Sequence, residues 1–265
     1  MPRQPRQSSG TGIYHVMMRG INHQNIFEDA EDYYQFLTTL DTMSLSYEPD
    51  GTLAGRNYTL YAYCLMSNHF HLLIREREDS LGMAIKRIAS SYVYYYNHKY
   101  SRDGHLFRER FKSEPVNDIA YFVTLLRYIH QNPLKAGIVK EVKDYEFSSW
   151  QEYNDKNSVL FPLCDTRTVL NRIPYIELSE LVNEPLSDDI GCLDIEDSSK
   201  GRPSDDQIML YIKEKTGVTN SSAFQQLPDE VKKSVLIDLK DSRASLRQLE
   251  RLTGISMGKI YRLKP

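Results

Sequence analysis

The feature that most constrains the fold is a pair of apolar runs within residues 61–76, separated by a short polar corner. The stretch reads YAYCLMSNHFHLLIRE, and Ser67 and Asn68 form the corner. Two apolar runs joined by two polar residues are typical of a β-hairpin. Because side chains alternate across a strand, His69 and His71 project from one face of the second strand. The sequence therefore predicts two imidazoles side by side on a sheet.

Two neutral imidazoles held on one strand suit a divalent metal ion. The alternative is a pair of buried histidines that only pack in the core, and the pair alone leaves both explanations open. A third histidine, His15, lies on the strand expected at residues 13–19, where it could approach the metal face or simply pack, and we favour packing.

The remaining periodicities predict an α+β domain. Strands are expected at residues 13–19, 58–66, 69–75 and 111–116, helices from residue 29, over 80–98 and over 118–131, and a loop over 47–57. This order is typical of a ferredoxin-like antiparallel sheet with helices on one face. The last helix is expected to end at Asn132, because Pro133 disfavours helical geometry in the residue before it.

Composition predicts a cytoplasmic protein without a membrane segment. Of the 265 residues, 40% are hydrophobic and 26% are charged, as in ordinary soluble proteins. No apolar run is long enough to span a bilayer, and no apolar core follows the basic residues at the N-terminus. The three cysteines, Cys64, Cys164 and Cys192, are far apart and lack metal-ligand spacing.

Basic and aromatic residues are mixed between residues 86 and 112. Such a mixture suits a groove that follows phosphates and stacks unpaired bases, although a solvated surface loop explains the composition equally well. The tyrosines between residues 92 and 96 have helical spacing, which favours packing. The segment also contains Lys99, and its candidate DNA-binding residues are Lys86, Arg87, Arg102, Arg108, Arg110 and Lys112.

Four motifs in order resemble the REP-associated tyrosine transposases, a branch of the single-tyrosine HUH endonuclease superfamily. They are YHVMMRGINHQNIF, MSNHFHLLI, GHLFRERFKS and LRYIHQNPLKAGIV, within residues 11–150. The resemblance implies that His69 and His71 are the metal pair, Tyr128 the nucleophile and Asn132 the third ligand, through its side-chain oxygen. It also implies Mg or Mn as the metal, single-stranded or hairpin DNA as the substrate, and a 5'-phosphotyrosine intermediate. In the wider superfamily the tyrosine helix can come from a second subunit, so a homodimer is a possible arrangement.

The rest of the chain predicts a connecting segment and a helical module. We expect the catalytic domain at residues 11–153, an acidic connection at 154–203 and a helical domain at 204–265. Residues 244–264 have the pattern of a helix-turn-helix, with a turn at 253–255. Lys259 and Arg262 are its candidate DNA contacts.

Three functions are compatible with the sequence. The first is a metal-dependent enzyme that nicks and rejoins DNA. The second is a catalytically silent DNA-binding regulator, which the presence of all four site residues disfavours. The third is a metal-dependent hydrolase that uses water in place of tyrosine, and it would turn over without forming a protein-DNA adduct.

Overall fold

The computed structural model describes residues 6–155, 162–186, 192, 203 and 205–263. The chain forms two compact units, one of residues 1–133 and 139–194, the other of residues 134–138 and 195–265. Among the described residues, no helix is both long and apolar enough to cross a membrane. Within the acidic connection expected at residues 154–203, residues 156–161, 187–191 and 193–202 lie outside the described residues.

A four-stranded antiparallel sheet forms the centre of the first unit. Its strands have the order β4-β5-β1-β6, with β1 Ile13–Arg19, β4 Tyr58–Met66, β5 His69–Glu76 and β6 Lys112–Pro115. Helix α1 (Ala30–Ser44) follows β1, and α2 (Leu81–Lys99) follows β5. This order and connectivity confirm the ferredoxin-like fold class.

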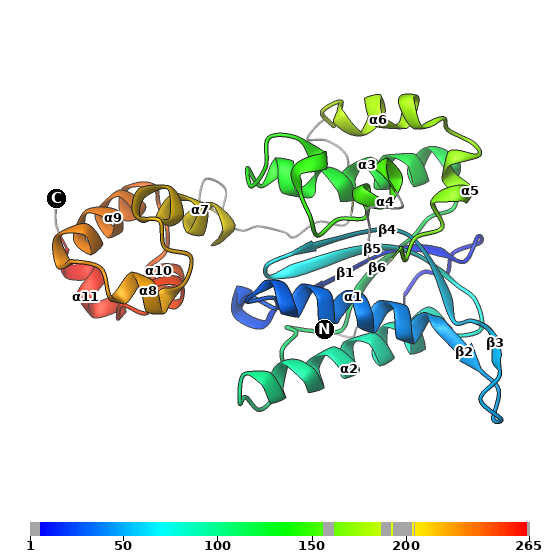
Figure 1. Cartoon of the computed structure of the whole chain (residues 1–265), viewed down its shortest axis with the longest axis horizontal. Coiled ribbons are helices and arrows are strands. Elements are labelled where there is room, and N and C mark those ends of the chain that lie inside the picture. Colours follow the sequence, from blue (N-terminus) through cyan, green and yellow to red (C-terminus); the bar gives the residue numbers. More distant parts are fainter. Residues whose placement is uncertain (1–5, 156–161, 187–191, 193–202, 204, 264–265) are drawn as a thin grey trace. The chain divides into compact units, whose positions relative to one another are not determined.

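The two faces of the sheet carry different side chains and different helices. Helices α1 and α2 cover one face, while α3 (Ile119–Lys135) lies on the other (Figure 1). On the α1 and α2 face, the Phe36 ring of α1 lies 4.7 Å from that of Phe70 and 5.0 Å from that of Tyr92. On the α3 face, the Phe122 ring packs edge-on against Tyr61 at 5.3 Å. The prediction of helices on one face therefore holds for α1 and α2. Helix α3 covers the opposite face of the sheet (Figure 1).

Shorter elements complete the first unit. A two-stranded hairpin occupies part of residues 47–57. The prediction of a loop over this whole range was therefore wrong. The remaining elements are β2 Leu45–Tyr47, β3 Leu53–Arg56, η1 Ile21–His23, η2 Val142–Asp144, α4 Trp150–Asn154, α5 Thr166–Leu170 and α6 Tyr175–Asn183.

The turn before His69 is held by the segment that follows β1. The backbone N–H groups of Ile26 and Phe27 both donate to the carbonyl of Ser67, at 2.7 and 3.0 Å. The Gly20 N–H donates to the carbonyl of Asn68 at 2.9 Å. The position and angle of the turn therefore depend on residues 20–27.

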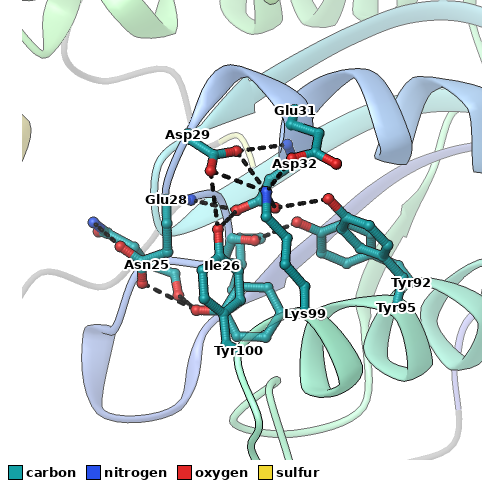
Figure 2. A network of polar contacts seen from close by, with 11 residues as sticks. Asn25, Ile26, Glu28, Asp29, Glu31, Asp32, Tyr92, Tyr95, Lys99 and Tyr100 are labelled. Carbon is teal, nitrogen blue, oxygen red and sulfur yellow. Dashed lines mark hydrogen bonds and ion pairs between the residues drawn. The ribbon is translucent and has the colours of Figure 1, made fainter.

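A cluster of charged and aromatic side chains in turn fixes residues 25–29 against α2 (Figure 2). Lys99 at the end of α2 lies 2.8 Å from Asp29, 3.0 Å from Glu31 and 2.9 Å from Asp32. The Tyr92 hydroxyl donates to the Ile26 carbonyl at 2.5 Å. Because Ile26 also bonds the Ser67 carbonyl, this cluster supports the turn from the face of the sheet opposite the histidines.

We expect Gly20→Ala to destabilise this turn. A Cβ atom at Gly20 would lie 2.2 Å from the Gln24 carbonyl oxygen and 3.0 Å from Ile26. Backbone must move to remove such an overlap, at a cost of about 1–3 kcal/mol in the free energy of unfolding. Gly82→Ala in α2 is the control, because nothing lies within 4 Å of its Cβ and alanine favours helix. Urea unfolding would measure both, and equal stabilities would contradict the prediction.

The second unit is a small helical bundle with its own apolar core. Ile208, Ile212, Phe224, Leu249 and Ile260 are fully or almost fully buried in it. Its helices are α7 Asp205–Thr216, α8 Ser221–Gln225, α9 Asp229–Asp241, α10 Leu246–Thr253 and α11 Met257–Arg262.

Helices α10 and α11 are joined by a short turn. Ser245 and Gln248 form a capping box at the start of α10, and Gly254 ends it in the left-handed region, with φ 70°. The turn occupies residues 254–256, one residue later than expected. Two short helices joined in this way fit the expected helix-turn-helix pattern, and its use in DNA binding stays a prediction.

Candidate active site

Three histidines lie together on the α3 face of the sheet. His69 and His71 are two residues apart on β5, and His15 lies on the neighbouring strand β1. The exposed fraction is 0% for His15 and His71 and 7% for His69. The expected pair is therefore present on one face. His15 is buried and also contacts His71, so it lies on the metal face, and packing alone, the explanation that we favoured, does not describe it fully.

Hydrogen bonds assign the proton of His69 and connect His71 to His15. Nδ1 of His69 lies 2.6 Å from Oδ1 of Asn68. A carboxamide oxygen can only accept, so His69 carries its proton on Nδ1 and a lone pair on Nε2. Nδ1 of His71 shares a hydrogen bond of 2.9 Å with Nε2 of His15. Nε2 of His71 is buried and makes no hydrogen bond to any described residue.

Burial keeps both imidazoles neutral at neutral pH. Burial, together with the nearby Arg19 guanidinium, lowers the pKa of His69 to about 3. Burial lowers the pKa of His71 well below its usual range, and the neighbouring His69 and His15 add to this effect. Neutral imidazole is the form that binds metal ions.

Tyr128 of the same chain lies against these histidines. Its ring centroid is 5.6 Å from that of His71 and 5.9 Å from that of His15, both in edge-on geometry. The side chain is 2% exposed. Helix α3 delivers it there, and Asp118 caps the start of this helix, because its carboxylate accepts the Tyr121 N–H at 2.8 Å. The structure thus brings the expected nucleophile and the histidine pair together within one chain.

Asn132 lies one helical turn after Tyr128. Its side-chain amide donates to the Tyr128 carbonyl at 3.0 Å, and its Oδ1 makes no hydrogen bond to the described residues. The helix does not end here as expected, because it continues through Pro133 to Lys135. The Gln131 amide helps to hold this last turn in place, because it donates to the carbonyls of Val182 in α6 and of Glu184 just after α6, both at 2.7 Å.

The residues present fit a divalent metal ion. His71 offers a buried nitrogen without a partner among the described residues, and His69 offers a second lone pair. No group of three His, Cys, Asp or Glu side chains in the described part of the chain is arranged to hold a metal. An ion bound here would therefore need an oxygen ligand of another kind, and Oδ1 of Asn132 is of that kind.

Several basic residues lie at the same end of the sheet as His69. Arg19 is directly opposite His69 in the register of β1 and β5. The Arg108 backbone N–H donates to the Arg19 carbonyl at 3.0 Å, and the side chains of Arg108 and Arg110 are exposed. Lys112 on β6 pairs with Met17 on β1. The sequence interpretation missed Arg19, although the strand spacing from His15 to Arg19 was sufficient to place it on the histidine face.

Other candidate cations lie elsewhere or have other partners. Lys86 and Arg87 are near the start of α2, which follows the far end of β5, and Arg87 forms an ion pair of 2.7 Å with Asp79. The Arg102 guanidinium bonds Gln24 and lies over the Tyr96 ring. Lys99 is surrounded by three carboxylates (Figure 2). Composition between residues 86 and 112 therefore overestimated the basic surface beside the histidines.

Comparisons with known proteins find similar sequences. Residues 9–132 match the model of the family described as Transposase IS200 like. A curated protein of Haemophilus influenzae, described as a REP-associated tyrosine transposase, is 26% identical over 112 residues, which are 38% of this chain and 62% of that protein. This chain thus matches less than two thirds of the length of that relative.

A solved structure of a REP-associated tyrosine transposase bound to a REP hairpin is also similar. The TM-score is 0.47 with 18% identity, covering 63% of this chain and 93% of the other. The family match and the curated relative confirm the resemblance seen in the four motifs. Residues 9–132 therefore match the IS200-like transposase family model, and the chain is similar to REP-associated tyrosine transposases.

Proposed function

We propose that this chain is a metal-dependent enzyme that nicks and rejoins single-stranded or hairpin DNA through a covalent bond to Tyr128. The observation that carries the proposal is the contact of Tyr128 with His71, at 5.6 Å between ring centroids. Histidines that only pack in the core would not require a tyrosine from a separate helix beside them, whereas a nucleophile must lie beside the metal ligands. The family match supports a DNA-cleaving enzyme over residues 9–132.

The proposed reaction exchanges one phosphodiester for another. The Tyr128 oxygen attacks the scissile phosphorus, the bond from phosphorus to the 3' oxygen breaks, and the phenol proton leaves while the 3' oxygen gains one. A 5'-phosphotyrosine and a free 3'-hydroxyl result, and attack by a 3'-hydroxyl reverses the step. A tyrosine hydroxyl has an ordinary pKa near 10 and is a weak nucleophile at neutral pH. A divalent ion held by His69, His71 and Asn132 would polarise the phosphate and offset its developing charge.

The basic residues around Arg19 would hold the DNA backbone near the histidines. Arg19 and Lys112 lie on strands β1 and β6, and Arg108 and Arg110 belong to the loop between α2 and β6. A cation near His69 also suits a phosphate bound at the same place. Lys86, Arg87 and Arg102 do not belong to this basic group, and their roles in DNA binding stay predictions. The description of the Haemophilus relative as REP-associated supports REP elements as the class of target.

The test is a covalent trapping assay. The purified chain is mixed with labelled single-stranded DNA containing a short hairpin, together with Mg or Mn, and adducts that resist denaturation are separated by electrophoresis. An adduct supports the proposal. Cleavage without an adduct would favour a hydrolase that uses water, and DNA binding without cleavage would favour a silent regulator.

The helical unit is proposed as a second DNA-binding part. Lys259 and Arg262 on α11 are exposed, and so is Tyr261 between them, at 73%. Exposed cations beside an aromatic ring suit contacts with phosphates and bases. The core residue Ile260 fixes the opposite side of the helix.

We expect Lys259→Ala with Arg262→Ala to weaken DNA binding by the full chain. Each lost phosphate contact should reduce the slope of log affinity against log salt by about 1. Fluorescence anisotropy over a range of salt concentrations would measure this. Lys213→Ala with Lys233→Ala is the control, because it removes the same charge from exposed positions on α7 and α9. Equal slopes in the two double variants would contradict a specific role for α11.

A further inference from the structure

We infer that Glu114 and His15 are positioning residues that fix the proton of His71 on Nδ1 and so keep its Nε2 available to a metal ion. This inference rests on the proposed function, because it concerns the same metal site. It adds a carboxylate and an imidazole behind His71, on strands that the metal pair does not occupy. Neither residue touches the reacting atoms in this scheme.

The sheet register places the two residues behind His71. His15 on β1 pairs with Glu114 on β6, and its neighbour Met17 pairs with His71 on β5. Nε2 of His15 is 2.9 Å from Nδ1 of His71. Nδ1 of His15, on the other side of the same ring, is 3.9 Å from Oε2 of Glu114. The three side chains thus form a row across β6, β1 and β5.

The charge of Glu114 determines the direction of the hydrogen bond. At 3.9 Å the contact with His15 is electrostatic and too long for a direct hydrogen bond. A negative oxygen nevertheless favours a proton on the nearer nitrogen, Nδ1 of His15. His15 Nε2 then carries a lone pair and must accept from His71. A proton on Nδ1 of His71 leaves its buried Nε2 as the metal-binding nitrogen.

Helix α3 holds Glu114 in place. The Tyr121 hydroxyl donates to Oε2 of Glu114 at 2.7 Å. Tyr121 precedes Tyr128 by seven residues, so the two side chains lie on the same face of α3 about two turns apart. The helix that supplies the proposed nucleophile therefore also orients the carboxylate of the row.

Mutation of a residue that orients a metal ligand typically lowers the affinity for the metal by 10–100-fold. We expect that loss from Glu114→Gln, which keeps the size of the side chain and removes its charge. His15→Leu should cause a similar loss, because it removes the acceptor for His71. His15→Gln should restore much of the affinity, since its amide oxygen can accept from Nδ1 of His71. Tyr121→Phe should show a smaller loss.

Two measurements on the full chain test the inference. Calorimetric titration with MnCl2 gives the affinity of each variant. Long-range proton-nitrogen NMR spectra of the metal-free protein distinguish which ring nitrogen of His71 is protonated, with the His71→Gln spectrum providing the assignment. Glu146→Gln is the matched control, because Glu146 also accepts a tyrosine hydroxyl, from Tyr34 at 2.5 Å, and takes no part in the row.

The expected result is weaker Mn binding in Glu114→Gln and His15→Leu, with the His71 proton no longer confined to Nδ1. The control should match the unmodified chain in both measurements. Unchanged affinity and an unchanged His71 spectrum in both variants would overturn the inference. If the unmodified chain binds Mn no better than His69→Ala, the metal site of the proposed function fails. The His71 spectrum of metal-free Glu114→Gln then still decides whether Glu114 sets the proton.

Discussion

Tyr128→Phe is expected to abolish the covalent protein-DNA adduct. Phenylalanine keeps the ring that packs against His71 and His15 and removes only the oxygen that would bond to phosphorus. Loss of a nucleophile reduces covalent catalysis by several orders of magnitude, so adduct formation should fall at least about 1000-fold. The trapping assay with hairpin DNA measures the change.

The interpretation of that result depends on intact folding and binding. Tyr128→Phe should bind hairpin DNA with an affinity close to that of the unmodified chain, which anisotropy would show. Tyr94→Phe is a suitable control, because Tyr94 on α2 is 77% exposed and makes no contact with the histidines. An adduct that persists in Tyr128→Phe and disappears in Tyr94→Phe would place the nucleophile on α2 and contradict its assignment to Tyr128 on α3.

His71→Ala is expected to remove both the metal ion and the adduct. The substitution deletes the buried Nε2 and also the partner of His15. A metal ion contributes several kcal/mol to stabilising phosphoryl charge in a transition state, which corresponds to about 1000-fold in rate. Calorimetry with MnCl2 and the trapping assay should change together.

Alanine at a buried position also leaves a cavity, so the control must address folding. His71→Gln fills more of the space, and circular dichroism during urea unfolding shows whether either variant is folded. His98→Ala removes an exposed histidine of α2 and should leave Mn affinity and adduct formation unchanged. Normal Mn affinity in folded His71→Ala would place the metal ion elsewhere or remove it from the scheme.

The sequence predicted the sheet well because its signals are local. Alternating apolar residues and the corner at Ser67 and Asn68 define β4 and β5 almost to the residue. The spacing of His69 and His71 then decides their shared face without any knowledge of the rest of the chain. Tyr128 needed the family resemblance, since nothing in its own neighbourhood distinguishes it from the many other tyrosines.

The errors arose where distant contacts override local preference. Pro133 predicted the end of α3, but the Gln131 amide donates to the carbonyls of Val182 in α6 and of Glu184 after it, and the last turn stays helical. The hairpin of β2 and β3 lies in a stretch whose glycines and proline favoured a loop. His15 was interpreted as packing because its partner, His71, is 56 residues away in the chain.

The support of the turn by residues 25–29 has a consequence for the energetics of binding. Lys99 and Tyr92 hold this segment through folded-state contacts made on the far side of the sheet (Figure 2). The Ser67 carbonyl, and with it the approach to His69, is therefore ordered before any ligand arrives. The conformational entropy lost in ordering this part of the site belongs to folding, so it is not subtracted from the affinity for metal or DNA. Lys99, which belonged to the basic stretch that resembled a DNA surface in the sequence, thus serves preorganisation of the site.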